Sequence, residues 1–167
     1  MSSLELRRKC GYKRRSRAAG PKATAHGEAR SFGAFMGLPE EERAAACEMD
    51  TVVGLKSDRR CLLTLYQRPC KFQLALLMPG KDCGSTSDRL DALEKAVGKA
   101  AFSRMFGLVL TDNGAEFSDC AAIERSALPG AAKRCSVYYC DARQSQQKAD
   151  ASATTSSCAR SCRRGAA

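Results

Sequence analysis

The sequence predicts an α/β fold with a mixed five-stranded sheet and flanking helices, and three observations support this. Short apolar runs recur between turns rich in Gly, Pro and charged residues, as expected of buried strands. Two later segments have the three-to-four residue spacing of amphipathic helices. The 167 residues suffice for one compact domain with an arm or tail. We therefore divide the chain into residues 1–44, a basic arm with a short helix, residues 45–148, the folded core, and residues 149–167, a disordered tail.

The arm carries most of the positive charge. Residues 1–31 contain nine Lys and Arg against two acids, in a chain of net charge +10. This concentration favours a polyanionic partner such as DNA, although a solvated, disordered tail explains the charge equally well. The residues that would bind nucleic acid are Arg7, Arg8, Lys9, Lys13, Arg14, Arg15 and Arg17. Phe32, Phe35 and Met36 then recur at helical spacing and predict one short helix within residues 31–42.

Three strands are predicted next, over residues 47–55, 61–66 and 72–78. Asp50 interrupts the apolar residues of the first strand. A carboxylate inside a strand is costly unless it is paired, hydrogen-bonded or metal-bound, so Asp50 is a candidate functional residue. If Asp50 stood alone, an acid on the exposed face of a half-buried strand would be the simpler interpretation.

Two helices follow these strands. Ser85 and Asp88 are spaced like a capping box, which predicts a helix start at this point. Asp91 and Lys95 are one turn apart on this helix and predict an ion pair on its surface. Gly98 is expected to end the helix and to begin a second, shorter one.

Residues 106–119, FGLVLTDNGAEFSD, give the most informative pattern of the chain. A buried strand around Val109 ends abruptly, and Asp112 follows at its carboxyl end, where open α/β sheets bind ligands. Asn-Gly between apolar runs is also a strong hairpin signal. The residues after the turn have helical rather than strand spacing, however, which favours a strand, a turn and then a helix.

A fifth strand is predicted over residues 135–141, and the character of the chain then changes. After Tyr139 the sequence contains no Val, Ile, Leu, Met, Phe, Tyr or Trp. Such a segment cannot bury an apolar face. We therefore expect the final helix of the core to be missing or disordered.

Composition argues against several classes of protein. The start of the chain lacks the apolar segment of a signal peptide, and no run of about eighteen apolar residues occurs. We therefore expect a cytoplasmic protein that does not associate with a membrane. The ten cysteines include no CxxC pair and the only histidine is His26, which argues against a zinc site. We expect these cysteines to be mostly reduced.

Three motifs, in order, carry a resemblance to one enzyme family. They are EMDTVVG at residues 48–54, TDNGAEF at residues 111–117 and YYCDARQSQQK at residues 138–148. Together they are similar to the insertion-sequence-thirty (IS-thirty) family of bacterial DDE transposases, over about residues 4–148. The resemblance implies a ribonuclease H-like integrase core and DNA transposition by phosphodiester strand transfer. It also implies DNA as the partner and allows a homo-oligomeric assembly.

The resemblance assigns the chemistry to two acids. Asp50 and Asp112 match the first two carboxylates of the family's catalytic triad and would bind Mg²⁺ or Mn²⁺. Strand transfer needs charge relief on the attacking and leaving oxygens, which two metal ions held by oxygen ligands supply. Asn113 and Glu116 match the motif as supporting residues. Taken alone, Asp112 before Asn-Gly would be interpreted as a turn-forming residue.

The chain departs from the family at both ends. The family has an amino-terminal helix-turn-helix region before the arm, and we expect a truncation there. After Lys148 the family continues with a helix that carries the third acid in a Glu-x-x-His pattern, which is absent here.

The tail itself suggests how that helix was lost. Residues 151–165 can be encoded by permitted codons that begin GCG AGC GCA ACC ACG TCG. Such codons can be read in a shifted frame that starts at the third nucleotide of the Ala151 codon. This frame gives Glu-Arg-Asn-His-Val-Glu-Leu-Arg-Lys-Ile-Leu-Pro-Lys-Gly. This string restores both the Glu-x-x-His pattern and the missing apolar residues. We therefore predict a frame shift that removed the third metal ligand and left only weak metal binding.

Three functional interpretations remain open from the sequence. The first is an inactive fragment of a transposase core. The second is a non-catalytic DNA-binding protein that uses its basic arm. The third is a metal-dependent nuclease of the same fold, in which Glu116, Asp119 or Asp141 replaces the missing acid.

Overall fold

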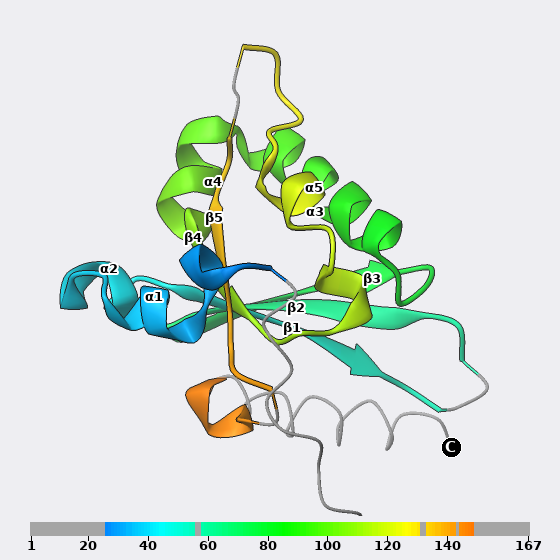
Figure 1. The fold of residues 1–167 in the computed structure, drawn as a ribbon. Coiled ribbons are helices and arrows are strands. Elements are labelled where there is room, and N and C mark those ends of the chain that lie inside the picture. The colour runs from blue at the N-terminus through cyan, green and yellow to red at the C-terminus, as the bar shows by residue number, and fades with distance from the viewer. Residues whose placement is uncertain (1–25, 56–57, 131–132, 143, 149–167) are drawn as a thin grey trace, which may run out of the picture.

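A computed structural model describes residues 26–55, 58–130, 133–142 and 144–148. Its five strands form one sheet in the order β3-β2-β1-β4-β5 (Figure 1). The strands are β1 (Cys47–Val53), β2 (Cys61–Gln67), β3 (Phe72–Met78), β4 (Leu108–Thr111) and β5 (Ser136–Tyr139). The first three pair antiparallel, and β4 runs parallel to both β1 and β5. The predicted α/β fold with a mixed sheet is confirmed, and this strand order is consistent with a ribonuclease H-like topology.

Three helices pack on one face of this sheet and form the main core (Figure 1). They are α3 (Cys83–Val97), α4 (Lys99–Phe106) and α5 (Cys120–Glu124). Met49 of β1, Leu63 of β2 and Phe102 of α4 are buried together in this layer. Burial of each such side chain stabilises the fold by about 1.5–3 kcal/mol. Because side chains alternate along a strand, Glu48 and Asp50 face the other side of the sheet.

The second face of the sheet is covered near β4 and β5 by α1 (Phe32–Met36). The next helix, α2 (Glu40–Ala44), has no buried residue. Phe35 packs there with Leu110 and Cys140 in a smaller core. The short helix predicted within residues 31–42 is present as α1, but a second helix, α2, which was not predicted, begins in the same stretch. Pro39 lies immediately before α2, and its fixed φ and missing N–H suit a helix start but not the continuation of α1.

The helix starts also differ from the prediction at one point. Asp82 is the N-cap of α3, and its Oδ1 accepts a hydrogen bond of 2.8 Å from the backbone N–H of Ser85. The predicted capping box of Ser85 and Asp88 was wrong, because Asp82 takes the capping position one turn earlier. Gly98 separates α3 from α4 as predicted, with a φ of 80° that favours glycine.

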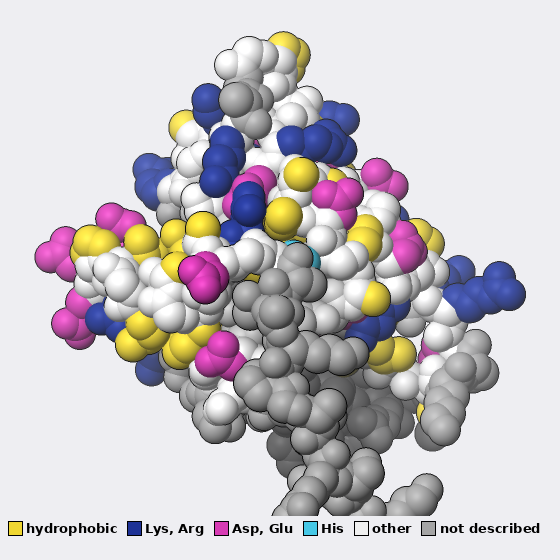
Figure 2. Space-filling model, viewed as in Figure 1, with side chains coloured by type: hydrophobic (Ala, Val, Ile, Leu, Met, Phe, Trp, Pro, Cys, Tyr) yellow, Lys and Arg dark blue, Asp and Glu magenta, His cyan; other side chains and the backbone are white. Residues whose placement is uncertain are grey.

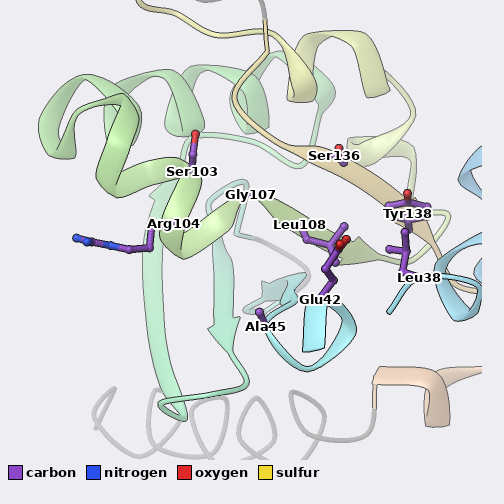
Figure 3. Close-up of a pocket in the computed structure, with 9 residues that line it drawn as sticks. All are labelled: Leu38, Glu42, Ala45, Ser103, Arg104, Gly107, Leu108, Ser136 and Tyr138. Carbon is purple, nitrogen blue, oxygen red and sulfur yellow. The ribbon is translucent and has the colours of Figure 1, made fainter. Parts of the chain in front are cut away.

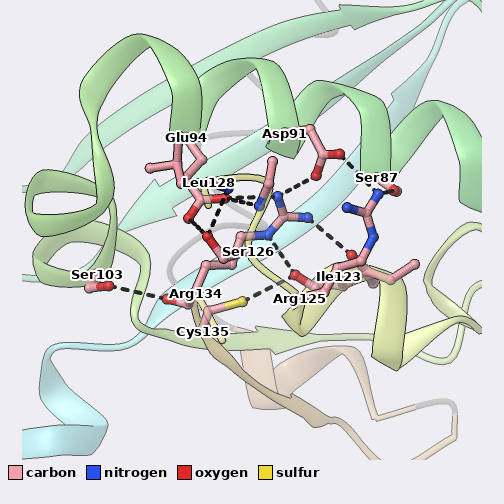
Figure 4. A network of polar contacts seen from close by, with 12 residues as sticks. Ser87, Asp91, Glu94, Ser103, Ile123, Arg125, Ser126, Leu128, Arg134 and Cys135 are labelled. Atoms are coloured by element: carbon pink, nitrogen blue, oxygen red, sulfur yellow. Dashed lines mark hydrogen bonds and ion pairs between the residues drawn. The ribbon is translucent and has the colours of Figure 1, made fainter. Parts of the chain in front are cut away.

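A buried polar network joins α3 to the segment that enters β5 (Figure 4). The side chain of Arg134 has 0% exposure and lies 2.5 Å from Asp91 and 3.5 Å from Glu94. Its Nε also donates a 2.7 Å hydrogen bond to the carbonyl of Ile123. Asp91 pairs with Arg134 and Arg125, and not with Lys95 as the sequence predicted.

Two further predictions concern cysteines and membranes. The cysteines that the structure describes are all free, as expected of a reduced protein: Cys47, Cys61, Cys70, Cys83, Cys120, Cys135 and Cys140. Within the described ranges, no helix has the length and apolar character needed to cross a membrane.

Candidate functional site

Asp50 and Asp112 come from neighbouring parallel strands and lie side by side. Asp50 is in β1, and Asp112 directly follows the last residue of β4. A hydrogen bond of 3.2 Å from the Thr111 hydroxyl to the carbonyl of Met49 joins the residues that precede the two acids. The Asp50 side chain is 27% exposed and that of Asp112 is 50% exposed. Both carboxylates are therefore reachable from solvent while their backbones are fixed in the sheet.

Each of these carboxylates uses one oxygen locally and presents the other to a shared partner. Oδ1 of Asp50 accepts a 2.7 Å hydrogen bond from the N–H of Thr51, and Oδ1 of Asp112 accepts a 3.1 Å bond from the N–H of Gly114. The second bond is the local Asp turn that the Asp-Asn-Gly sequence favours. Both Oδ2 atoms face the same ammonium group, that of Lys148.

Lys148 lies in the short helix η3 (Ser145–Lys148), which follows β5. Its Nζ lies 3.5 Å from Oδ2 of Asp50 and 3.9 Å from Oδ2 of Asp112. The same Nζ donates a 3.3 Å hydrogen bond to the carbonyl of Met49. The distance between the two Oδ2 atoms therefore cannot exceed the sum of their distances to Nζ of Lys148. Sequence reasoning missed this role of Lys148, which stood only as the last residue of the third motif.

Asn113 supports the site by joining two strand ends. Its side-chain amide donates a 2.6 Å hydrogen bond to the carbonyl of Cys140, just after β5. The backbone of Cys140 in turn donates a 2.8 Å bond to the carbonyl of Thr111. Asn113 therefore holds the turn that carries Asp112 against the end of β5. Burial raises the pKa of the Cys140 thiol to about 12, so this cysteine is a neutral thiol at neutral pH.

Among the described residues, Glu116 is not grouped with the two aspartates as a possible metal-binding set. It is 2% exposed, accepts a 2.6 Å hydrogen bond from the Thr51 hydroxyl and lies 3.1 Å from the ammonium of Lys81. Its carboxylate folds over Gly114, where a Cβ atom would come within 2.7 Å of Oε2. Glu116 thus packs against the turn after Asp112, and a side chain at residue 114 would displace its carboxylate.

The other candidate replacements for a third acid are also engaged in local structure. Asp119 caps α5 by accepting a 2.9 Å hydrogen bond from the N–H of Ala122. Asp141 is bonded to the side chain of Gln147 at 2.9 Å. Glu48, which sequence reasoning missed, shares the sheet face of Asp50 but pairs with Arg68 at 2.6 Å.

The fit of a divalent metal ion to this site can be judged from its donor set. Among the described residues, no three His, Cys, Asp or Glu side chains are grouped so that they could hold a metal ion. Two carboxylate oxygens are available, and an ammonium already lies between them. Mg²⁺ and Mn²⁺ are held by oxygen ligands and repelled by a nearby cation. The site as it stands therefore fits a metal ion poorly.

A groove elsewhere on the molecule is distinct from this site (Figure 3). It has a volume of about 310 Å³ and is lined by Leu38, Glu42, Ala45, Ser103, Arg104, Gly107, Leu108, Ser136 and Tyr138. Leu108 and Ser136 are the first residues of β4 and β5, whereas Asp112 follows the end of β4. The groove thus lies at the opposite end of the parallel strands.

The predicted nucleic-acid-binding residues of the arm, Arg7 to Arg17, lie outside the described residues, as does the tail from residue 149. On the face in Figure 2, the Lys and Arg side chains of the described residues are mixed with Asp and Glu. Several cations of the described residues are paired with acids, among them Arg125 with Asp91 and Lys133 with Glu124.

Comparison with known proteins adds no assignment. No family model matches this chain, and a search of curated proteins finds no match. The case for a function therefore depends on the fold, the site geometry and the three motifs.

Proposed function

We propose that this chain is the core of a DDE transposase that has lost strand transfer because its third metal-binding carboxylate is missing. One observation carries the proposal. Asp50 of the first strand and Asp112, which directly follows the fourth strand of the β3-β2-β1-β4-β5 sheet, present carboxylate oxygens to the same ammonium group. That is the relationship expected of two members of a carboxylate triad in an integrase-like core.

The chemistry of the complete enzyme explains why a third acid matters. Divalent ions in such enzymes stabilise the attacking and leaving oxygens during phosphodiester transfer, and oxygen ligands must hold them. Asp50 and Asp112 would supply two of these ligands. The third would come from a helix after Lys148, where this chain has no Val, Ile, Leu, Met, Phe, Tyr or Trp with which to pack a helix. With the donor set that remains, Mg²⁺ or Mn²⁺ would bind only weakly.

The active-nuclease alternative has less support. It needs Glu116, Asp119 or Asp141 as a third ligand beside the two aspartates. Each of these acids is held in another local contact, by Thr51, by the start of α5 and by Gln147 respectively. A non-catalytic DNA-binding function remains a second candidate, because the positive charge is concentrated in residues 1–31.

A repaired chain tests the proposal. In it, residues 149 and 150 are kept and residues 151–167 are replaced by Glu-Arg-Asn-His-Val-Glu-Leu-Arg-Lys-Ile-Leu-Pro-Lys-Gly, the string obtained by shifting the frame. We expect the original chain to leave supercoiled plasmid DNA intact in Mn²⁺, and the repaired chain to nick it. The activity of the repaired chain should disappear in its Asp112→Asn variant, which removes a charge but keeps the side-chain shape.

Two outcomes would overturn the proposal. Metal-dependent nicking by the original chain that is lost in Asp112→Asn would favour the nuclease alternative. A repaired chain that folds but gains neither Mn²⁺ binding nor nicking would show that the missing helix is not what separates this chain from an active enzyme.

A further inference from the structure

The ammonium of Lys148 lies where three oxygen atoms converge. These are Oδ2 of Asp50, Oδ2 of Asp112 and the carbonyl oxygen of Met49, at 3.5 Å, 3.9 Å and 3.3 Å from Nζ. All three come from the adjacent strand segments that carry the two acids. The Lys148 side chain is only 6% exposed, although the carboxylates that it contacts are partly open to solvent.

We propose that Lys148 is a built-in counter-cation that occupies the position between Asp50 and Asp112 and excludes divalent metal ions from it. The inference rests on the proposed function, because that function makes the two aspartates former metal ligands. It goes further by assigning to a residue of this chain the role of the absent ion in neutralising them.

Two physical points support this role. First, the Oδ1 atoms of both aspartates are engaged by backbone N–H groups, so the Oδ2 atoms that face Lys148 are the ones a metal ion would need. A metal ion bound to both would lie close to the ammonium, and the two positive charges would repel each other. Second, the Lys148 side chain is only 6% exposed, so its stem would have to leave buried surroundings to relieve the repulsion.

Added negative charge can reverse the preference of the two aspartates for the ammonium over a divalent ion. In the repaired chain, a third carboxylate beside Asp50 and Asp112 would favour a divalent ion over a single ammonium. Lys148 therefore acts as an excluding group only while the third acid is missing.

Mn²⁺ titration of the full chain tests the proposal without DNA. Binding is measured by calorimetry and by the electron paramagnetic resonance signal of free Mn²⁺, and thermal unfolding is followed with and without the ion. Lys148→Met keeps an unbranched side chain one atom shorter and removes the charge, whereas Lys148→Arg keeps the charge. Lys95→Ala, which removes an exposed lysine of α3, is the matched control.

We expect Lys148→Met to bind Mn²⁺ at least about tenfold more tightly than the original chain and to be stabilised by the ion. Lys148→Arg and Lys95→Ala should behave like the original chain. Adding Asp50→Asn to Lys148→Met should abolish the gain, because it removes one of the two ligands.

The proposal is overturned if the original chain binds Mn²⁺ as tightly as Lys148→Met, or if Lys148→Met is folded and gains no binding. Equal gains in Lys148→Arg and Lys148→Met would also overturn it, since the charge would then be irrelevant. If Lys148→Met does not fold, Lys148→Gln takes its place in the same titration. These readouts need no catalysis, so failure here is distinct from failure of the repaired chain to nick DNA.

Discussion

Arg134 and Glu94 form an ion pair in which both side chains have 0% exposure, with Nη1 of the arginine 3.5 Å from Oε2 of the glutamate. The pair is not isolated. Glu94 also accepts hydrogen bonds from the Ser126 hydroxyl at 2.6 Å and from the N–H of Ala127 at 2.8 Å. This network ties α3 to the loop that leads into β5 (Figure 4).

Removing Arg134 should therefore destabilise the fold strongly. We expect Arg134→Met to lower the free energy of unfolding by about 3–5 kcal/mol, because Glu94 would be left buried without its cation. Arg125→Met is the matched control, since Arg125 pairs with Asp91 but is 50% exposed, and it should cost less than about 1 kcal/mol. Urea denaturation measures both. Equal losses in the two variants would contradict the buried-network interpretation.

The pH dependence of stability should follow from Glu94 and Glu124. Burial by itself raises the pKa of Glu94, but hydrogen bonds from Ser126 and Ala127 and the charge of Arg134 outweigh it, and the pKa is lowered. The pKa of Glu124 is lowered as well. Burial raises this pKa, but the lowering effects, chiefly the hydrogen bond from Arg30, outweigh burial. Because both pKa values are below the ordinary value of 4.5, the charged forms stabilise the folded state.

This stabilisation should be complete above about pH 4.5 and should be lost as the pH falls through the lower pKa values of the folded state. Unfolding free energies measured from neutral pH down to about pH 3 test the direction. Glu94→Gln should be less stable at neutral pH and should lose less on acidification. A variant with the same acid-induced loss as the original chain would rule out a contribution from Glu94.

Gly98 is expected to resist substitution. Its φ of 80° between α3 and α4 lies in the region that residues with a Cβ atom rarely adopt. Gly98→Ala should cost about 1–2 kcal/mol by thermal or chemical denaturation. Gly33→Ala in α1 is the control, because an added Cβ there would meet only the Ser31 hydroxyl at 3.6 Å and should be neutral or slightly stabilising. The opposite order of the two effects would be inconsistent with the backbone as described.

DNA association should depend on the arm and on salt. Deletion of residues 1–25 removes most of the arm's Lys and Arg residues and keeps the Arg30 ion pair with Glu124. We expect the full chain to bind DNA without sequence preference, with log K falling by roughly 0.9 per phosphate contact against log salt concentration. Fluorescence anisotropy across a salt series measures the slope. If the deleted chain binds as well at equal salt, the arm is not the DNA-binding element.

The strands could be predicted from the sequence because their signals are local. Apolar runs between turn residues located all five strands, and β3 was predicted with its exact limits at Phe72 and Met78. Asp112 was placed at the end of β4 because Asn-Gly can follow a strand only as a sharp turn. Gly98 was recognised as a helix break because glycine is a poor residue for a helix interior.

The parts that could not be predicted depend on contacts between residues far apart in the chain. Lys148 reaches Asp50 and Asp112 only after the sheet has formed, and no spacing rule connects it to them. Asp91 fitted a local pair with Lys95, but tertiary packing brought Arg134 to it instead. Pro39 and Asp82 carry local signals for helix starts, which separate α2 from α1 and place the start of α3 at Cys83.

The nucleotide sequence across the codons for Gln147 to Ala167 tests most directly the claim that Asp50 and Asp112 are the remaining two acids of a three-acid centre. The account predicts codons that, read from the third nucleotide of the Ala151 codon, encode Glu-x-x-His followed by an apolar helix pattern. The same reading should continue for several residues without a stop codon. Codons whose shifted frames contain no Glu-x-x-His and no apolar periodicity would contradict the account.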